Sequence, residues 1–254
     1  MVSTDEDYNL SKKLLLQIPH TRTFSSNYII FPNNIDIGSF NYIHLFHKHQ
    51  ILSKLNIINY GNFEDSESGY SFSAKDYIFK NRFSSNINSK LYSSFDIKYI
   101  HSYIDNYSSD AVAFKFSLYY YNTRFLLQSF IDNYGITFSP YTNFYEHFPS
   151  SYGFKIMVLP KYINSVLSLK YNSFRDYQVL NISGELFLFS NSSIYVGFSS
   201  LSQKLYYGDF YTDFLTGFSI GFSTTYKKYF MNIAFKNLGS IGLISSLTIT
   251  KSIN

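Results

Sequence analysis

The sequence contains no cysteine and no tryptophan, and it has only four alanines, five glutamates and five prolines among 254 residues. Without cysteine the chain forms neither disulfides nor thiolate metal sites. The scarcity of alanine and glutamate, two strong helix formers, disfavours a helical bundle. Charged residues make up 15% of the chain and apolar residues 45%, a balance that argues against intrinsic disorder.

Long hydrophobic runs are missing too. The longest apolar stretches, such as residues 14–16, are far shorter than a membrane-spanning helix. The start is a poor signal peptide, because residues 5–7 are acidic and the short apolar region ends at Pro19. We therefore expect either that the protein is not exported or that its leader lies outside this chain.

Positive charge is present but scattered. The net charge is +4, and the lysines and arginines occur mostly singly rather than in clusters. A nucleic-acid-binding face needs a basic patch or stripe, so we expect no nucleic-acid partner.

Aromatic residues are abundant instead, with 26 tyrosines and 27 phenylalanines. In the segment 214–224 large and small side chains alternate. Phe214, Phe218, Ile220 and Phe222 are at even positions, and glycine, serine and Leu215 are at odd positions. A period of two predicts a β-strand whose two faces meet different surroundings.

The same alternation recurs at 91–103, 112–120, 152–158, 229–235 and 241–249. Weaker candidates lie near 28–31, 36–46, 51–60, 69–75, 124–138, 166–174, 178–189 and 192–199. Many of these segments are about ten residues long, which is the length that crosses a bilayer as a tilted strand. The sequence therefore predicts an all-β fold, an antiparallel transmembrane β-barrel of about 12–14 strands. We assign 28–254 to the barrel domain and 1–27 to a poorly defined amino-terminal segment.

Turn residues separate these segments. Asn191 with Ser192, and Tyr226 with Lys227 and Lys228, read as hairpin turns. Every proline falls at or near a boundary between candidate strands, as expected because a proline removes a ladder donor. The prolines are Pro19, Pro32, Pro140, Pro149 and Pro160.

A soluble β-sandwich is the alternative fold, because its strands alternate in the same way. Three features favour the barrel: the long strands, a polar face with few charges, and enough tyrosine and phenylalanine for two aromatic girdles. In a barrel we expect Phe218, Ile220 and Phe222 to face lipid, whereas in a sandwich they would be packed between two sheets.

A series of short motifs lies between residues 55 and 170. Its positions are Tyr60, Gly61, Phe63, Asp65, Gly69, Phe72, Ala74 and Asp76, then Lys98, Tyr107, Ser108 and Ser109, and then Asn133, Gly135 and Pro149. In this order and spacing the motifs resemble those of the PorV/PorQ family, and of its PorQ-like members in particular. The family's amino-terminal segment has no good match before residue 40.

The resemblance implies a FadL-like outer-membrane barrel that serves the type IX secretion system of Bacteroidetes-like, Gram-negative bacteria. PorQ-like members help to hold the complex that attaches secreted proteins to the cell surface. It also implies no enzymatic activity and no cofactor. The partners implied are outer-membrane lipid and the proteins of that secretion complex.

The acidic block 60–76 has a physical interpretation of its own. Gly61 and Gly69 flank Glu64, Asp65 and Glu67, and this composition predicts a solvated loop between two strands. The alternatives are a loop that docks a protein partner and a calcium site, although the spacing matches no known calcium loop.

Four charged residues fall on the polar faces of candidate strands: Asp96, Lys98, Lys115 and Lys155. In a barrel they would meet in the lumen, where we expect ion pairing, with a solute-selective constriction as the alternative. His44, His47 and His49 read as polar turn residues rather than metal ligands, because no acidic partner is near. No catalytic arrangement stands out among the many serines.

We therefore predict a non-enzymatic PorQ-like scaffold for surface partner proteins. The first alternative is a FadL-like pore for small or hydrophobic solutes, and the second is a soluble β-sandwich that binds glycans.

Overall fold

The computed structural model describes residues 22–46, 49–64, 67, 69–122, 124–142, 148–189, 191–201 and 215–253. Within these ranges the chain forms fourteen strands and one 3₁₀ helix. The elements are β1 (Arg22–Ile30), β2 (Asp36–Phe46), β3 (His49–Glu64), β4 (Ser71–Asn86), β5 (Leu91–Ile104), β6 (Tyr107–Tyr121), β7 (Phe125–Ser139), β8 (Ser151–Val158), β9 (Ser165–Phe174), β10 (Gln178–Phe189), β11 (Ser192–Ser199), β12 (Phe218–Tyr226), β13 (Tyr229–Asn237), η2 (Gly239–Ile241) and β14 (Leu243–Ile253).

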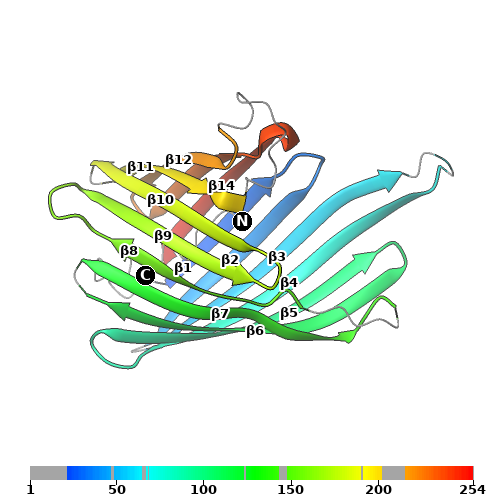
Figure 1. Cartoon of the computed structure of the whole chain (residues 1–254), viewed down its shortest axis with the longest axis horizontal. Coiled ribbons are helices and arrows are strands. Elements are labelled where there is room, and N and C mark those ends of the chain that lie inside the picture. The colour runs from blue at the N-terminus through cyan, green and yellow to red at the C-terminus, as the bar shows by residue number, and fades with distance from the viewer. Residues whose placement is uncertain are drawn as a thin grey trace.

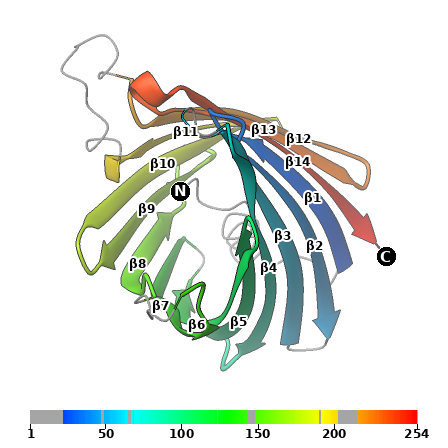
Figure 2. The same ribbon diagram turned by 90° about the vertical axis from the view of Figure 1, so that its right-hand side faces the viewer.

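The strands form one closed antiparallel barrel in which each strand pairs with its neighbours in sequence (Figures 1 and 2). The first and last strands close the ring, with Arg22 opposite Ile253 and Ile30 opposite Ser245. Closure leaves no free sheet edge, so every strand finds hydrogen-bond partners on both sides. The predicted antiparallel barrel is confirmed, with fourteen strands.

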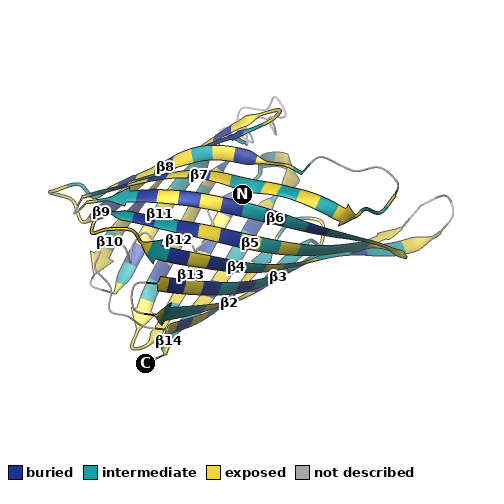
Figure 3. Ribbon diagram, turned by 90° about the horizontal axis from the view of Figure 1, so that it is seen from below, coloured by how far each residue is buried: buried dark blue, intermediate teal, exposed yellow. Residues whose placement is uncertain are grey.

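Buried and exposed residues alternate along the strands (Figure 3), because successive side chains of a strand point to opposite faces of the sheet. On β12, Phe218, Ile220 and Phe222 are 45%, 56% and 45% exposed, while Gly221 and Ser223 on the opposite face are buried. Among the described residues no second sheet covers these large side chains, so the β-sandwich alternative is wrong. The outer surface is apolar on every strand, as hydrocarbon requires.

The two ends of the barrel differ. Both termini of the sheet lie at one end, which we call the termini end, together with short turns such as 190–191 and 227–228. The connections at the other end, which we call the loop end, include the longer segments 140–150 and 200–217. Short turns at one end and longer loops at the other are typical of outer-membrane barrels.

Strand length is uneven around the ring. The strands β3 and β4 have 16 residues each, whereas β8 and β11 have 8. The β3–β4 hairpin therefore projects past the other strands at the loop end (Figures 1 and 3). A strand of about 9–11 residues spans the hydrocarbon layer, so β3–β7 extend beyond it.

Several boundaries differ from the predicted ones. The strand β1 begins at Arg22, so residues 22–27 of the segment assigned to the amino terminus are part of the barrel. The strand β4 continues to Asn86, because polar residues such as Lys80 and Arg82 face the lumen and hide the alternation. Residue 214 lies outside the described residues. Pro32, Pro140, Pro149 and Pro160 lie outside the strands, as predicted; Pro19 is outside the described part.

Candidate functional site

The lumen side of β4–β7 carries a network of alternating charges. Arg82 lies opposite Asp96, and its Nε and Nη2 atoms donate to the two carboxylate oxygens at 2.8 and 2.9 Å. On the next strand Lys115 lies opposite Asp96, and its Nζ is 3.2 Å from Asp132 Oδ2. Lys98 Nζ contacts Asp132 Oδ1 at 2.6 Å. Asp96 thus lies between Arg82 and Lys115 in register, and Asp132 contacts two lysines; we call these five residues the charged network.

A β-bulge in β7 turns two consecutive residues toward Lys98. The pairing of β6 with β7 shifts between Phe114 and Phe116, and Asn133 has a φ of 55°. Asparagine tolerates this left-handed conformation better than most residues do. As a result, side-chain oxygens of both Asp132 and Asn133 lie 2.6 Å from Lys98 Nζ.

The network is most deeply buried at its β4–β5 end. The side chains of Arg82 and Asp96 are 4% and 0% exposed, compared with 16% and 21% for Lys98 and Asp132. Burying both charges of a pair costs solvation, which a two-contact arginine–carboxylate geometry offsets. The pair therefore packs against the lumen wall and holds a fixed arrangement.

Phe130 connects the charged network to the strands that follow. The Nζ atoms of Lys115 and Lys170 lie 5.0 and 5.4 Å from the centre of its ring. Lys170 on β9 lies directly opposite Lys155 on β8. Like charges opposite each other repel, and the contact with the ring face lowers the cost of placing Lys170 here.

A cavity of about 120 Å³ lies against the lumen wall between β8 and β14, and we call it the wall cavity. At one level of the cavity, four neighbouring strands, β9 to β12, each contribute a small residue. These residues lie side by side in register: Ser168, Ser183, Gly197 and Ser219. Small side chains leave space that larger ones would fill. Apolar side chains line it further: Met157, Val166, Ala234 and Ile244.

Two buried charged groups also line the wall cavity. Glu185, which is 3% exposed, accepts a hydrogen bond from Ser193, and Ser193 is 2.6 Å from Ser223. Within the described part of the chain, Glu185 Oε2 has no hydrogen-bond partner. Lys236 is 6% exposed and forms no ion pair with a described residue. The cavity therefore offers both an acceptor and a cation to a bound solute.

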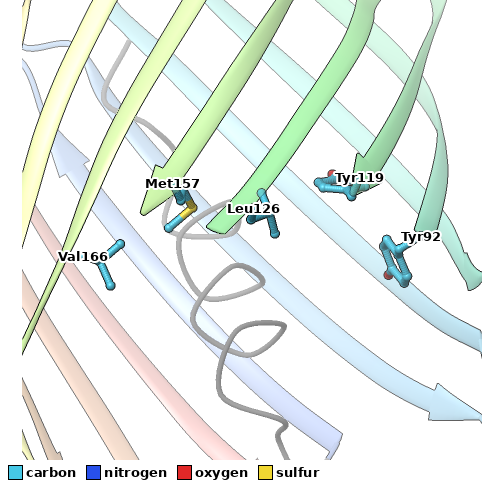
Figure 4. Packing of buried hydrophobic residues seen from close by; sticks show 5 residues of the cluster. All are labelled: Tyr92, Tyr119, Leu126, Met157 and Val166. Atoms are coloured by element: carbon cyan, nitrogen blue, oxygen red, sulfur yellow. The ribbon is translucent and has the colours of Figure 1, made fainter. Parts of the chain in front are cut away.

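Large apolar side chains gather in the lumen toward the termini end (Figure 4). The cluster consists of Tyr92, Tyr119, Leu126, Met157 and Val166. The two tyrosine rings meet edge to face at 5.4 Å, and their hydroxyls bond to glutamine side chains on β3 and β7. The lumen wall is thus partly apolar at this level.

The structure brings three of the four predicted lumen charges together, since Asp96, Lys98 and Lys115 all belong to the charged network. Lys155 lies apart from them and lines the wall cavity. Sequence reasoning missed Arg82, Asp132, Glu185 and Lys236. Asp132 lies on the inward face of β7, as do Leu126 and Phe130. These two apolar residues obscure the alternation of polar and apolar positions along the strand.

The motif residues near the loop end have structural contacts. Tyr60 donates to Asp76 at 2.7 Å, and the rings of Phe63 and Phe72 stack at 5.2 Å. Gly61, with a φ of 83°, lies in a bulge of β3. The strands extend to Glu64 and from Ser71, so residues 60–64 and 71–76 of the predicted loop belong to β3 and β4. Gly69 lies in that loop with a φ of 66°, Ala74 is buried on β4, and Asp65 lies outside the described residues.

The remaining motif residues are distributed over β6, β7 and the segment before β8. Tyr107, Ser108 and Ser109 pair with the end of β5. A side chain at Gly135 would meet the Val112 carbonyl oxygen at 2.4 Å, so glycine is required there. Pro149 precedes β8. None of these residues lies in the charged network or lines the wall cavity, except that Asn133 contacts Lys98.

The histidines do not form a metal site within the described residues, where no group of three potential ligands occurs. His44 lies beside Tyr42, with ring centres 6.3 Å apart, and His49 is exposed at the start of β3. His47 lies outside the described residues. Among the residues described, no helix is both long and apolar enough to span a membrane.

Together, the closed ring, the apolar exterior and the charged lumen define a transmembrane β-barrel. Large apolar side chains are 37–72% exposed on strands all around the ring, a surface that water disfavours and hydrocarbon accepts. The apolar outward residues and the charged inward residues belong to the same strands. A single alternation of side-chain direction along each strand therefore accounts for both surfaces.

The fold is similar to that of outer-membrane transport barrels. The Pseudomonas putida toluene transporter TodX matches at a TM-score of 0.59 and 10% identity, over 94% of this chain and 91% of TodX. The Ralstonia pickettii toluene transporter TbuX matches at 0.60 and 8%, over 93% and 89%. A Pseudomonas aeruginosa FadL homologue matches at 0.56 and 7%, over 91% and 90%. At such low identities, the structural similarity establishes that the fold is FadL-like and nothing beyond the fold. No family model and no curated protein matches the sequence.

Proposed function

We propose that this barrel is a non-enzymatic outer-membrane channel for small apolar or amphiphilic solutes. The observation that carries the proposal is the wall cavity. Its volume of about 120 Å³ is close to that of a protein cavity that binds benzene, roughly 150 Å³. Apolar lining with a few placed polar groups is typical of small-molecule sites.

The charges of the lumen wall favour solutes that carry a negative group. Eight basic and four acidic residues occupy inward positions on the described strands, which leaves four positive charges in excess. The basic residues are Lys54, Lys80, Arg82, Lys98, Lys115, Lys155, Lys170 and Lys236, and the acidic ones are Asp76, Asp96, Asp132 and Glu185. A wall charged in this way raises the local concentration of anions.

The comparisons support a transport role more than a scaffold role. Two of the similar structures are described as toluene transporters, and the third is a FadL homologue. Transfer of that activity to this chain is part of the proposal, because the likeness extends only to the fold.

The experiment combines binding with conductance. We expect toluene or benzoate to bind the detergent-purified barrel saturably in a calorimetric titration, and the barrel to conduct ions in planar bilayers. A barrel that shows neither would contradict the channel.

The secretion scaffold is the second candidate, and one observation favours it. At the loop end the long strands β3–β7 carry exposed aromatic side chains beyond the span that hydrocarbon covers. Phe63, Tyr107 and Tyr134 are 43%, 63% and 72% exposed. Such a surface suits a protein partner. Capture of secretion-complex proteins from outer membranes, lost on replacing these three residues by serine, would support the scaffold and its Bacteroidetes-like origin.

A further inference from the structure

The termini end of the barrel is basic all the way around. Seven exposed cations lie in its turns or in the last residues of its strands, and we call them the basic rim: Arg22, Lys90, Arg124, Lys161, Lys227, Lys228 and Lys251. None of the described residues in these turns, or in the last three strand residues beside them, is aspartate or glutamate.

The loop end has the opposite composition. Outside the lumen wall, its described acidic residues are Asp36, Glu64, Glu67, Asp105, Asp110 and Asp176, and its basic ones are Lys75 and Arg175; Lys170 and Lys236 also lie near this end but face the lumen. Charge is therefore sorted along the barrel axis. The sorting is not a result of the net charge, which is only +4 for the whole chain.

The basic rim borders the lipid-facing surface. Lys251 Nζ lies 5.7 Å from the ring centre of Tyr229, which points outward from β13 and is 45% exposed. Lys227 Nζ lies 5.3 Å from the ring of Tyr226, which is 67% exposed. Tyrosines at this position mark the level of the lipid headgroups, where lysine side chains reach water and phosphate.

We propose that the basic rim binds the phosphate groups of anionic phospholipids in the leaflet at the termini end. The cations occur in the turns β4–β5, β6–β7, β8–β9 and β12–β13 and where β14 meets β1, so they surround the barrel. A ring of this kind matches an annulus of lipid, whereas an acidic protein would need cations gathered on one side. The proposal rests on the transmembrane barrel and is independent of any channel activity.

The test measures lipid selectivity of the intact barrel. The full chain is reconstituted in phosphatidylcholine membranes, and spin-labelled phosphatidylglycerol and phosphatidylcholine are compared by electron paramagnetic resonance. We expect the anionic lipid to associate more strongly at low salt, with the preference weakening as salt screens the charges. A cation near a membrane surface changes such an equilibrium by about fivefold.

Variants assign the effect to the rim. The triple variant K227Q/K228Q/K251Q removes three of the seven rim cations and should weaken the preference, whereas K227R/K228R/K251R should retain it in full. The matched control, K75Q/R175Q, removes the cations at the loop end and should leave the preference unchanged. All variants are checked for folding by heat-modifiable mobility on gels.

Equal association of the two lipids with the folded wild-type barrel would overturn the proposal and leave an acidic protein as the partner of this rim. A preference as strong in the triple glutamine variant as in wild type, or one that disappears in the loop-end control, would overturn it as well.

Discussion

Arg82 and Asp96 lie opposite each other on β4 and β5 and form a two-contact ion pair inside the lumen, with Asp96 fully buried. Lys115 occupies the next position in register, so the carboxylate has a cation on each side. The pair is the most deeply buried part of the charged network. The ion pair links β4 and β5, which are consecutive in the chain. Because it lies inside the lumen, no outward-facing residue can form the same contact.

Removing one member of this pair should destabilise the barrel. Asp96→Asn leaves Arg82 buried without its carboxylate, and we expect a loss of about 3–5 kcal/mol in the free energy of unfolding. The double variant R82M/D96L removes both charges and should be closer to wild type than D96N. The measurement is urea-induced unfolding in lipid vesicles followed by gel mobility. A D96N barrel as stable as wild type would show that the pair contributes nothing.

A second prediction concerns the β3 bulge. Gly61 has a φ of 83°, and an added Cβ would lie 3.3 Å from the Asn34 carbonyl oxygen. Gly61→Ala should therefore cost about 1–2 kcal/mol, because left-handed backbone is unfavourable for residues with a Cβ. Gly38→Ala is the matched control: its φ is ordinary and nothing lies within 4 Å of the added atom. Equal unfolding midpoints for the two variants would contradict this account.

The fold could be predicted because lipid imposes one rule on every strand. Phe218, Ile220 and Phe222 must face outward, and that rule leaves a period of two in the sequence. Inward positions follow no such rule, since the lumen of this barrel accepts Leu126 and Phe130 as readily as Gln128 and Asp132. For this reason the alternation in the sequence predicts some strands only weakly or only in part. These are the strands with apolar inward residues or polar outward residues.

The site was harder to predict because it depends on which strands meet. The alternation placed Asp96, Lys98 and Lys115 on inward faces, but their partners Arg82 and Asp132 come from strands read weakly or only in part. The wall cavity has no sequence signal at all. It results from four small residues, Ser168, Ser183, Gly197 and Ser219, aligned across four strands by the register.

Filling the wall cavity should block solute binding without unfolding the barrel. Ser183 points into the cavity and is exposed there, so Ser183→Phe places a ring in the empty space. We expect calorimetric binding of toluene to be lost while the unfolding midpoint stays near that of wild type. Asn56→Phe, on the inward face of β3 and away from the cavity, is the control and should bind toluene normally. Unchanged binding in S183F would exclude this cavity as the solute site.

Charge selectivity provides the last prediction. The excess of inward cations should make the wild-type barrel prefer anions, because a positive wall attracts them and repels cations. Lys236→Gln removes a charge that lines the cavity and should reduce the anion-to-cation permeability ratio by about fourfold, because one charge acting through water across roughly 10 Å changes the energies of an anion and a cation by about 0.4 kcal/mol each, in opposite directions. Glu185→Gln should increase the ratio, since among the described residues Glu185 is the acidic one that lines the cavity. Reversal potentials in a salt gradient across a planar bilayer measure both changes. Opposite shifts are required, because a change in pore width or stability would move the two variants in the same direction.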